Sequence, residues 1–95
     1  MRDFPADEAV PGYALDTMRV HDLPRVLEIE RACFNDPWSR SAFLYEIRDN
    51  KVALNHVLRC MAQAGRVDAY SCLYFLEDEL EINNIAVDEI GRAHV

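Results

Sequence analysis

Hydrophobic positions recur with two different periods along the chain, and the change of period separates a helical region from a region of strands. Residues 13–20 alternate between apolar and polar positions and predict a first strand. The next segment has the spacing of an amphipathic helix, with Glu28, Glu30 and Arg31 on or beside its polar face. Its apolar stripe consists of Leu23, Val26, Leu27, Ile29, Cys33 and Phe34.

Short polar motifs set the limits of this first helix. Asp22-Leu23-Pro24 predicts its start, because an Asp side chain can accept from the first N–H groups and Pro lacks a donor where none is needed. Asn35-Asp36-Pro37 predicts its end, because the residue before a proline is disfavoured in helical conformation.

A second helix is predicted immediately afterwards. Ser39 suits the N-cap position, with Trp38 just before it and Phe43 at the fourth helical position. This spacing is typical of a hydrophobic staple, which holds the residue before the cap against the first turns of the helix. Asp49-Asn50 predicts the end of the helix.

From Val52 onward the period becomes two. Strands are predicted at residues 52–62, 67–76 and 80–87, joined by a turn at 63–66 and an acidic hairpin at 77–79. The strand at 67–76 is apolar on both faces and is therefore expected in the interior of the sheet. The order β-α-α-β-β-β predicts an α/β (α+β) fold in which an antiparallel meander carries two helices.

The last strand contains a change of phase. Leu80 and Ile82 share one phase of the alternation, whereas Ile85 and Val87 share the other. Since a strand keeps one face with a period of two, an extra residue must be absorbed between them, at Asn83-Asn84. The sequence therefore predicts a β-bulge there, or else an ordinary buried strand with two polar residues.

Composition restricts the class of protein. The 95 residues are 51% hydrophobic and 28% charged, which is typical of one small globular domain or part of one. A net charge of −7 argues against a nucleic-acid surface and suits cationic ligands or basic partners. The apolar runs are too short to cross a membrane and the N-terminus has no signal-peptide pattern, so no membrane partner and a cytoplasmic location are expected.

Residues that could bind a metal are few and scattered. His21, His56 and His94 form no ligand motif, so no metal site is predicted. Cys33, Cys60 and Cys72 form no CxxC pair and are expected to be small core residues. The acidic cluster Glu77, Asp78, Glu79 and Glu81 is either a solvated hairpin or a site that attracts, or deprotonates, an amine.

Three segments, in their order and spacing, resemble the GNAT superfamily of acetyl-coenzyme A-dependent N-acetyltransferases. They are Asp22-Leu23-Pro24 followed by Ile29-Glu30, then Phe34-Asn35-Asp36-Pro37-Trp38-Ser39, and then Asn84-Ile85-Ala86-Val87. The second is the most specific and is similar to the RimI type, the ribosomal-protein-alanine N-acetyltransferases. The resemblance covers residues 15–88 and corresponds to the N-terminal half of a GNAT fold.

This resemblance implies where acetyl-coenzyme A and substrate would bind. In the family, the fourth strand is bulged, its backbone N–H groups polarise the thioester carbonyl, and the pantetheine arm runs along it. That role falls on Asn84, Ile85, Ala86 and Val87 in this chain. The loop with Pro37, Trp38 and Ser39 would border the groove for the substrate, the N-terminal alanine of a ribosomal protein.

The resemblance stops before the family's pyrophosphate-binding loop, which is not recognisable in residues 89–95. Catalytic residues therefore remain unknown, because the family's glutamate base and tyrosine acid would lie beyond the end of the chain. Residues 89–95 also read like a translated sequencing adapter and are expected to be a non-native tail. The expected organisation is thus a flexible leader at 1–12, a partial acetyltransferase domain at 13–88, and that tail.

Two other functions remain open at this stage. One is a GNAT enzyme that acetylates a different amine. The other is a non-catalytic α/β interaction module whose acidic hairpin binds a basic partner. The 95 residues by themselves are expected to be inactive.

Overall fold

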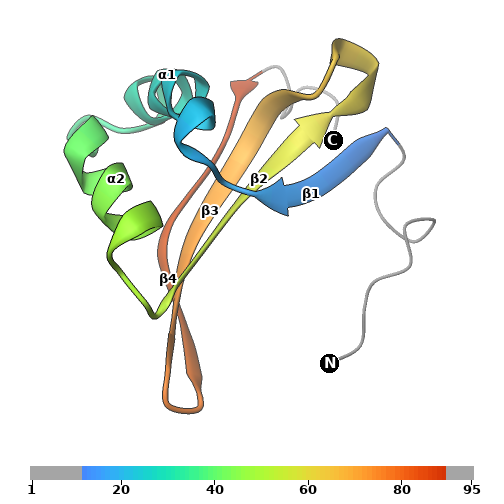
Figure 1. Cartoon of the computed structure of the whole chain (residues 1–95). Helices are drawn as coiled ribbons and strands as arrows, with labels where there is room; N and C mark the ends of the chain where they lie inside the picture. The colour runs from blue at the N-terminus through green and yellow to red at the C-terminus, as the bar shows by residue number, and fades with distance from the viewer. Residues whose placement is uncertain (1–11, 90–95) are drawn as a thin grey trace.

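A four-stranded antiparallel sheet carries both helices on one face (Figure 1). The structure, a computed structural model, describes residues 12–89. The sheet order β1-β2-β3-β4 confirms the predicted meander and places β3 between two neighbours. The predictions for the leader and the tail lie outside the described residues except at Gly12 and Glu89. The elements are β1 (Tyr13–Thr17), α1 (Leu23–Cys33), α2 (Arg40–Arg48), β2 (Ala53–Cys60), β3 (Arg66–Leu76) and β4 (Glu79–Val87).

The first strand is shorter than the alternation predicted. β1 ends at Thr17, and a 3-10 turn at Val20–Asp22 follows before α1 begins. The predicted capping of α1 by the Asp22 side chain is wrong. That carboxylate instead accepts from the Arg19 N–H at 2.9 Å and from two guanidinium nitrogens of Arg59, at 2.9 and 3.0 Å. Its oxygens are therefore committed to the turn and to β2, not to the helix.

The same ion pair joins the turn to the first two strands. Asp22 is buried, and Arg59 also binds Asp16 of β1 through its Nε at 2.9 Å. Burial alone would raise the pKa of the Asp22 carboxyl, but the hydrogen bonds from Arg59 and the Arg19 N–H outweigh it and lower that pKa below its ordinary value. Asp22 thus stays ionised inside the protein and ties α1's start to β2.

The connection between β2 and β3 begins earlier than predicted. β2 ends at Cys60, and a 3-10 turn at Met61–Gln63 replaces the last predicted strand positions. The chain then reverses through Ala64 and Gly65, whose φ angles of 56° and 78° lie in the left-handed region. Glycine has no Cβ and occupies that region without steric cost, which explains the turn at this point.

The helix caps of α2 follow the prediction closely. The Ser39 Oγ accepts from the Ala42 N–H at 3.2 Å. The Trp38 and Phe43 rings have centroids 5.2 Å apart, which confirms the staple. Phe43 is fully buried and packs edge-on against Tyr70 of β3, with the two ring centroids 5.7 Å apart. The staple therefore fixes the loop at residues 34–39 to the sheet as well as to α2.

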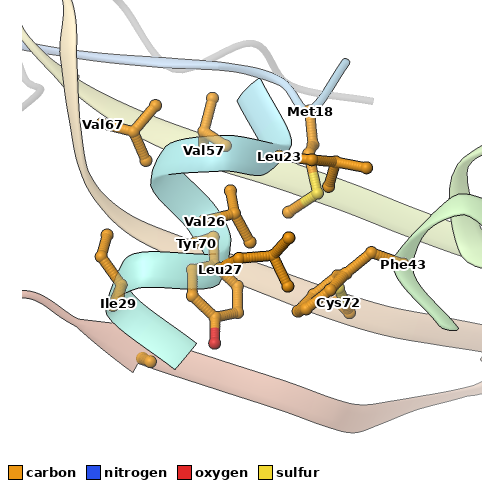
Figure 2. Close-up of a cluster of buried hydrophobic side chains, with 11 residues drawn as sticks. Met18, Leu23, Val26, Leu27, Ile29, Phe43, Val57, Val67, Tyr70 and Cys72 are labelled. Atoms are coloured by element: carbon orange, nitrogen blue, oxygen red, sulfur yellow. The ribbon is translucent and has the colours of Figure 1, made fainter. Parts of the chain in front are cut away.

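The core lies between α1 and the sheet, with α2 closing one end (Figure 2). α1 buries Leu23, Val26, Leu27 and Ile29 of the predicted stripe, and burial of such aliphatic side chains contributes about 1.5–3 kcal/mol each. Phe34, also predicted in the stripe, lies at the C-cap and is 37% exposed. Cys60 and Cys72 are buried as predicted, whereas Cys33 is half-buried. The core residues are Met18, Leu23, Val26, Leu27, Ile29, Phe43, Val57, Val67, Tyr70, Cys72 and Ala86.

The opposite face of the sheet is apolar and is not covered by any described helix. Leu15 of β1 is 70% exposed and Ile82 of β4 is 69% exposed. A hollow of about 160 Å³ with an apolar lining lies on this face, between His56, Ala69 and Ile85 among others. Contiguous apolar surface of this kind is unusual on a monomeric protein and is typical of a surface that another element or molecule covers.

Candidate functional site

β4 contains the predicted bulge. Ile82 pairs with Leu73 and Asn84 pairs with Cys72, so Asn83 is an extra residue with no partner on β3. The change of phase in the sequence therefore located the irregularity correctly. A bulge bends the strand and increases its local twist, and it alters which way the following residues point.

The bulge has a clear consequence for the faces of β4. Leu80, Ile82, Ile85 and Val87 pair with alternate residues of β3 and therefore all lie on the face away from the helices. Asn84 and Ala86 lie on the helix face, where they are 9% and 7% exposed. Without the extra residue, the last two apolar side chains would be on the opposite face from the first two.

The hydrogen-bond pattern also fixes the direction of the backbone N–H groups after the bulge. The Asp88 N–H donates to the Asp68 carbonyl of the neighbouring strand at 2.7 Å. Because N–H groups alternate in direction along a strand, those of Ile85 and Val87 point away from β3. The Val87 carbonyl also points outward, where it accepts from the Cys33 thiol at 3.5 Å. Within residues 12–89, β4 is an edge strand, so this outward side has no strand partner.

The loop between the helices lies close to this strand. Its residues Pro37 and Ser39 are exposed, and Trp38 is half-buried against Phe43. The Trp38 backbone N–H donates to the Glu30 Oε2 at 2.8 Å. The loop predicted to border a peptide groove is thus held from beneath by a carboxylate of α1.

The prediction for Glu30, on or beside the polar face of α1, is wrong, because this residue is 1% exposed and faces the sheet. Its Oε1 accepts from the Asn84 Nδ2 at 2.7 Å and from the Tyr70 hydroxyl. Spacing could have located it, since position 30 follows Val26 and Leu27 of the apolar stripe by four and three residues.

The pKa of Tyr70 reflects this environment. Burial raises the pKa of the Tyr70 hydroxyl, and the hydrogen bond to the Glu30 carboxylate raises it further. The hydroxyl is therefore protonated across the ordinary pH range and remains a donor to Glu30. Three donors from β3, β4 and the loop thus converge on one buried carboxylate.

A second group of charges fixes the end of β4. Asp68 is the extra residue of another register irregularity, between β2 and β3, and is 1% exposed. It accepts from the Arg66 Nε at 2.7 Å. Arg25 of α1 donates to the Val67 carbonyl at 2.9 Å and pairs with the Asp88 carboxylate at 3.1 Å. The point where the chain leaves β4 is therefore anchored to both α1 and β3.

The acidic hairpin lies at a distance from this region. Glu77, Asp78, Glu79 and Glu81 are all exposed, and the β3–β4 hairpin projects beyond α2, at the opposite end of the sheet from the loop 34–39 (Figure 1). The structure brings together the predicted segments 84–87 and 37–39, but it does not bring the acidic cluster to them.

Residues 12–89 offer neither a metal site nor a membrane-spanning helix. No group of three or more histidine, cysteine or acidic side chains there is arranged to hold a metal ion. Neither described helix is long and apolar enough to cross a membrane.

Comparison with known proteins supports the resemblance seen in the sequence. No protein-family model matches the chain. A protein of Bacillus subtilis (strain 168), assigned provisionally as a ribosomal protein bS18-alanine N-acetyltransferase, is 32% identical over 74 residues. This match covers 78% of the chain and 47% of that protein.

The fold is also similar to that of a protein with a solved structure. The ribosomal-protein-S18-alanine N-acetyltransferase from Escherichia coli matches with a TM-score of 0.67 and 29% identity, over 85% of this chain and 53% of that one. The chain thus spans about half the length of each protein that it matches. In sequence and in partial fold, the chain therefore is similar to RimI-type members of the GNAT superfamily of N-acetyltransferases, which confirms the family predicted from its motifs.

Proposed function

We propose that the full-length gene product transfers an acetyl group from acetyl-coenzyme A to the N-terminal alanine of a ribosomal protein, in the cytoplasm. The names of the two matched proteins support the reaction and the substrate. The structural observation that carries the proposal is the bulged edge of β4, whose N–H groups at Ile85 and Val87 point away from β3. Asn84, at the start of this edge, shares the Glu30 carboxylate with Trp38 of the loop 34–39.

Acyl transfer requires hydrogen-bond donors where the oxyanion develops. Backbone N–H groups held in a strand suit this role because they need no reorganisation during the reaction. In this proposal, Ile85 and Val87 supply such donors to the thioester carbonyl, and Asn84 and Ala86 hold the strand against α1. An extended pantetheine arm would add to the open edge in the manner of a further strand.

The substrate side of the proposal rests on Pro37, Trp38 and Ser39. Their loop is exposed on one side and fixed on the other by the N-cap, the staple and the hydrogen bond to Glu30. A rigid border of this kind can select a peptide N-terminus by shape. The α-amine has an ordinary pKa of about 7.7–8.0, so little help from a base is needed to deprotonate it.

The experiment is an acetylation assay with the full-length gene product and a peptide from the N-terminus of the host's ribosomal protein S18. Mass spectrometry is expected to show one added acetyl group on the terminal alanine. The same peptide with a blocked N-terminus is the matched control and should remain unmodified. Acetylation of a polyamine or a lysine side chain in place of the terminal amine would instead support a GNAT enzyme for another amine.

We also propose that the 95 residues alone bind acetyl-coenzyme A weakly and have no useful activity, because they span about half of the matched proteins. Calorimetric titration of the purified chain tests this directly. Micromolar binding by these residues would contradict it.

A further inference from the structure

Glu30 joins the two halves of the proposed site through its two oxygens. Oε2 accepts from the Trp38 N–H of the loop 34–39. Oε1 accepts from the Asn84 side chain, at the residue that follows the bulge of β4, and from Tyr70 of β3. The carboxylate is planar and rigid, so a displacement of one partner changes the hydrogen bonds available to the others.

The Glu30 carboxylate is held inside the protein by neutral donors. A buried carboxylate is costly unless its oxygens are well satisfied, and no cation forms an ion pair with Glu30 among residues 12–89. Neutral donors from three elements satisfy it instead. A carboxylate only accepts, so it can serve all three donors at once, whereas an amide or a hydroxyl there would have to donate as well.

Each hydrogen bond holds a feature on which the proposed function depends. Fixing the Asn84 side chain on the helix face sets the phase of the strand after Asn83, and therefore the outward direction of the Ile85 N–H. The hydrogen bond from the Trp38 N–H to Glu30 fixes the loop at Trp38, the residue that precedes the N-cap Ser39. The outward N–H groups and the loop are thus placed relative to each other by one side chain.

We propose that Glu30 is a positioning residue that couples the loop 34–39 to the bulge of β4, so that a ligand on either side strengthens binding on the other. This inference rests on the proposed function, which supplies the two ligands: coenzyme A along β4 and an alanine-initiated peptide at the loop. The coupling is reciprocal, because each ligand must raise the affinity of the other by the same factor.

The test compares binding free energies in the full-length gene product. Calorimetry measures the affinity for coenzyme A, which cannot transfer an acetyl group, with and without saturating peptide. We expect the peptide to increase this affinity at least about five-fold, a typical lower limit for coupled sites. In Glu30→Gln, which keeps the size of the side chain but replaces one acceptor by a donor, the factor is expected to fall towards one.

A matched control is available on the same helix. Glu28 is a largely exposed glutamate that pairs with Arg25 on the surface, so Glu28→Gln should keep the full coupling factor. Tyr70→Phe serves as the second variant if Glu30→Gln does not fold, because it removes one donor to Oε1 and preserves the ring; its factor should be intermediate. If Glu30→Gln folds and its coupling factor equals that of the wild-type protein, the inference is wrong. If Glu30→Gln does not fold, an unchanged coupling factor in Tyr70→Phe would overturn the inference.

Failure of the proposed function would be recognised separately. If the wild-type protein binds neither coenzyme A nor the peptide, hydrogen exchange of the ligand-free protein decides the question. Coupling requires that Glu30→Gln accelerates exchange both at the Trp38 N–H and at the Asn84 and Ala86 amides, which point towards β3. Faster exchange on one side only would show that Glu30 does not link them.

Discussion

Glu30 and Asn84 are 54 positions apart in the sequence, yet the Asn84 side-chain amide donates a 2.7 Å hydrogen bond to the Glu30 carboxylate inside the protein. The contact connects the middle of α1 to the strand position just after the bulge. It holds the strand after the bulge against α1, and changing either partner tests it directly.

Asn84→Asp would place a second carboxylate against Glu30 in a site that is 9% exposed. The donor is lost and two like charges face each other, so we expect a loss of about 2–3 kcal/mol of unfolding free energy at pH 7. Urea unfolding of the variant and of the wild-type protein at pH 7 measures this loss.

Asn83→Asp is the control for that variant. Asn83 is the exposed residue of the bulge and has no partner on β3, so its charge should change stability by less than about 0.5 kcal/mol. Equal destabilisation by the two variants would show that the contact with Glu30 is not what matters.

Arg59→Ala removes the cation from the buried Asp22 carboxylate. Breaking such a pair leaves an uncompensated buried charge, and we expect a cost of about 2–3 kcal/mol at pH 7. Arg19→Ala, at a surface pair in which Arg19 is 56% exposed, should cost less than about 1 kcal/mol. Thermal and urea unfolding provide the comparison.

The pH dependence of the same pair has a defined sign. Because the pKa of Asp22 is lowered in the folded state, its stabilising effect is complete above the unfolded pKa of about 3.9 and is lost as the pH falls through the lower folded value. The wild-type protein should therefore lose stability below about pH 4, in the window where the unfolded chain takes up the proton first. In Arg59→Ala this loss should be smaller, and an unchanged acid dependence would contradict the assignment.

The features predicted successfully from the sequence are those set by local patterns. The bulge follows from the phases of Ile82 and Ile85, and the staple follows from the spacing of Trp38 and Phe43. Both depend on residues a few positions apart, so no knowledge of packing is required. The roles of residues 84–87 and 37–39 came from family resemblance and remain predictions.

The features that were missed depend on contacts between distant segments. The spacing of α1 places position 30 beside the apolar stripe, but the partners that satisfy its buried carboxylate, Tyr70 and Asn84, come from β3 and β4. The bulge at Asp68 was hidden because the strand around it is apolar on both faces and shows no change of phase. The buried Asp68 carboxylate is paired with Arg66 of β3 and Arg25 of α1. A pairing with a residue of another element cannot be predicted from a local sequence pattern.

Ser39→Ala tests the cap that fixes the loop. Loss of the hydrogen bond between the Ser39 Oγ and the Ala42 N–H should lower the unfolding free energy by about 1 kcal/mol. Ser41→Ala, at an exposed position inside α2, should have little effect or a slightly stabilising one, since alanine favours helix. Denaturant titration of both variants measures the difference, and equal values would mean that the cap contributes nothing.

Cys72 should resist alkylation in the folded protein. It is fully buried, and burial followed by the nearby Glu46 and Glu30 carboxylates raises the pKa of its thiol to about 12. At pH 8 almost none is thiolate, the form that reacts. Mass spectrometry after brief iodoacetamide treatment should find no modification at Cys72, whereas treatment in guanidinium should modify it; labelling of Cys72 before unfolding would contradict this.

The apolar face away from the helices predicts how the purified 95-residue chain behaves. Leu15 and Ile82 lie on this face and are 70% and 69% exposed, so contact between two such faces would bury them. The double variant Leu15→Thr with Ile82→Thr should reduce self-association in sedimentation velocity and change stability by no more than about 0.5 kcal/mol per site. Val57→Thr, at a fully buried position on the helix face, should instead cost about 2 kcal/mol and leave association of the folded chain unchanged. If the double variant associates as strongly as the wild-type chain, the exposed face is not the surface through which copies meet.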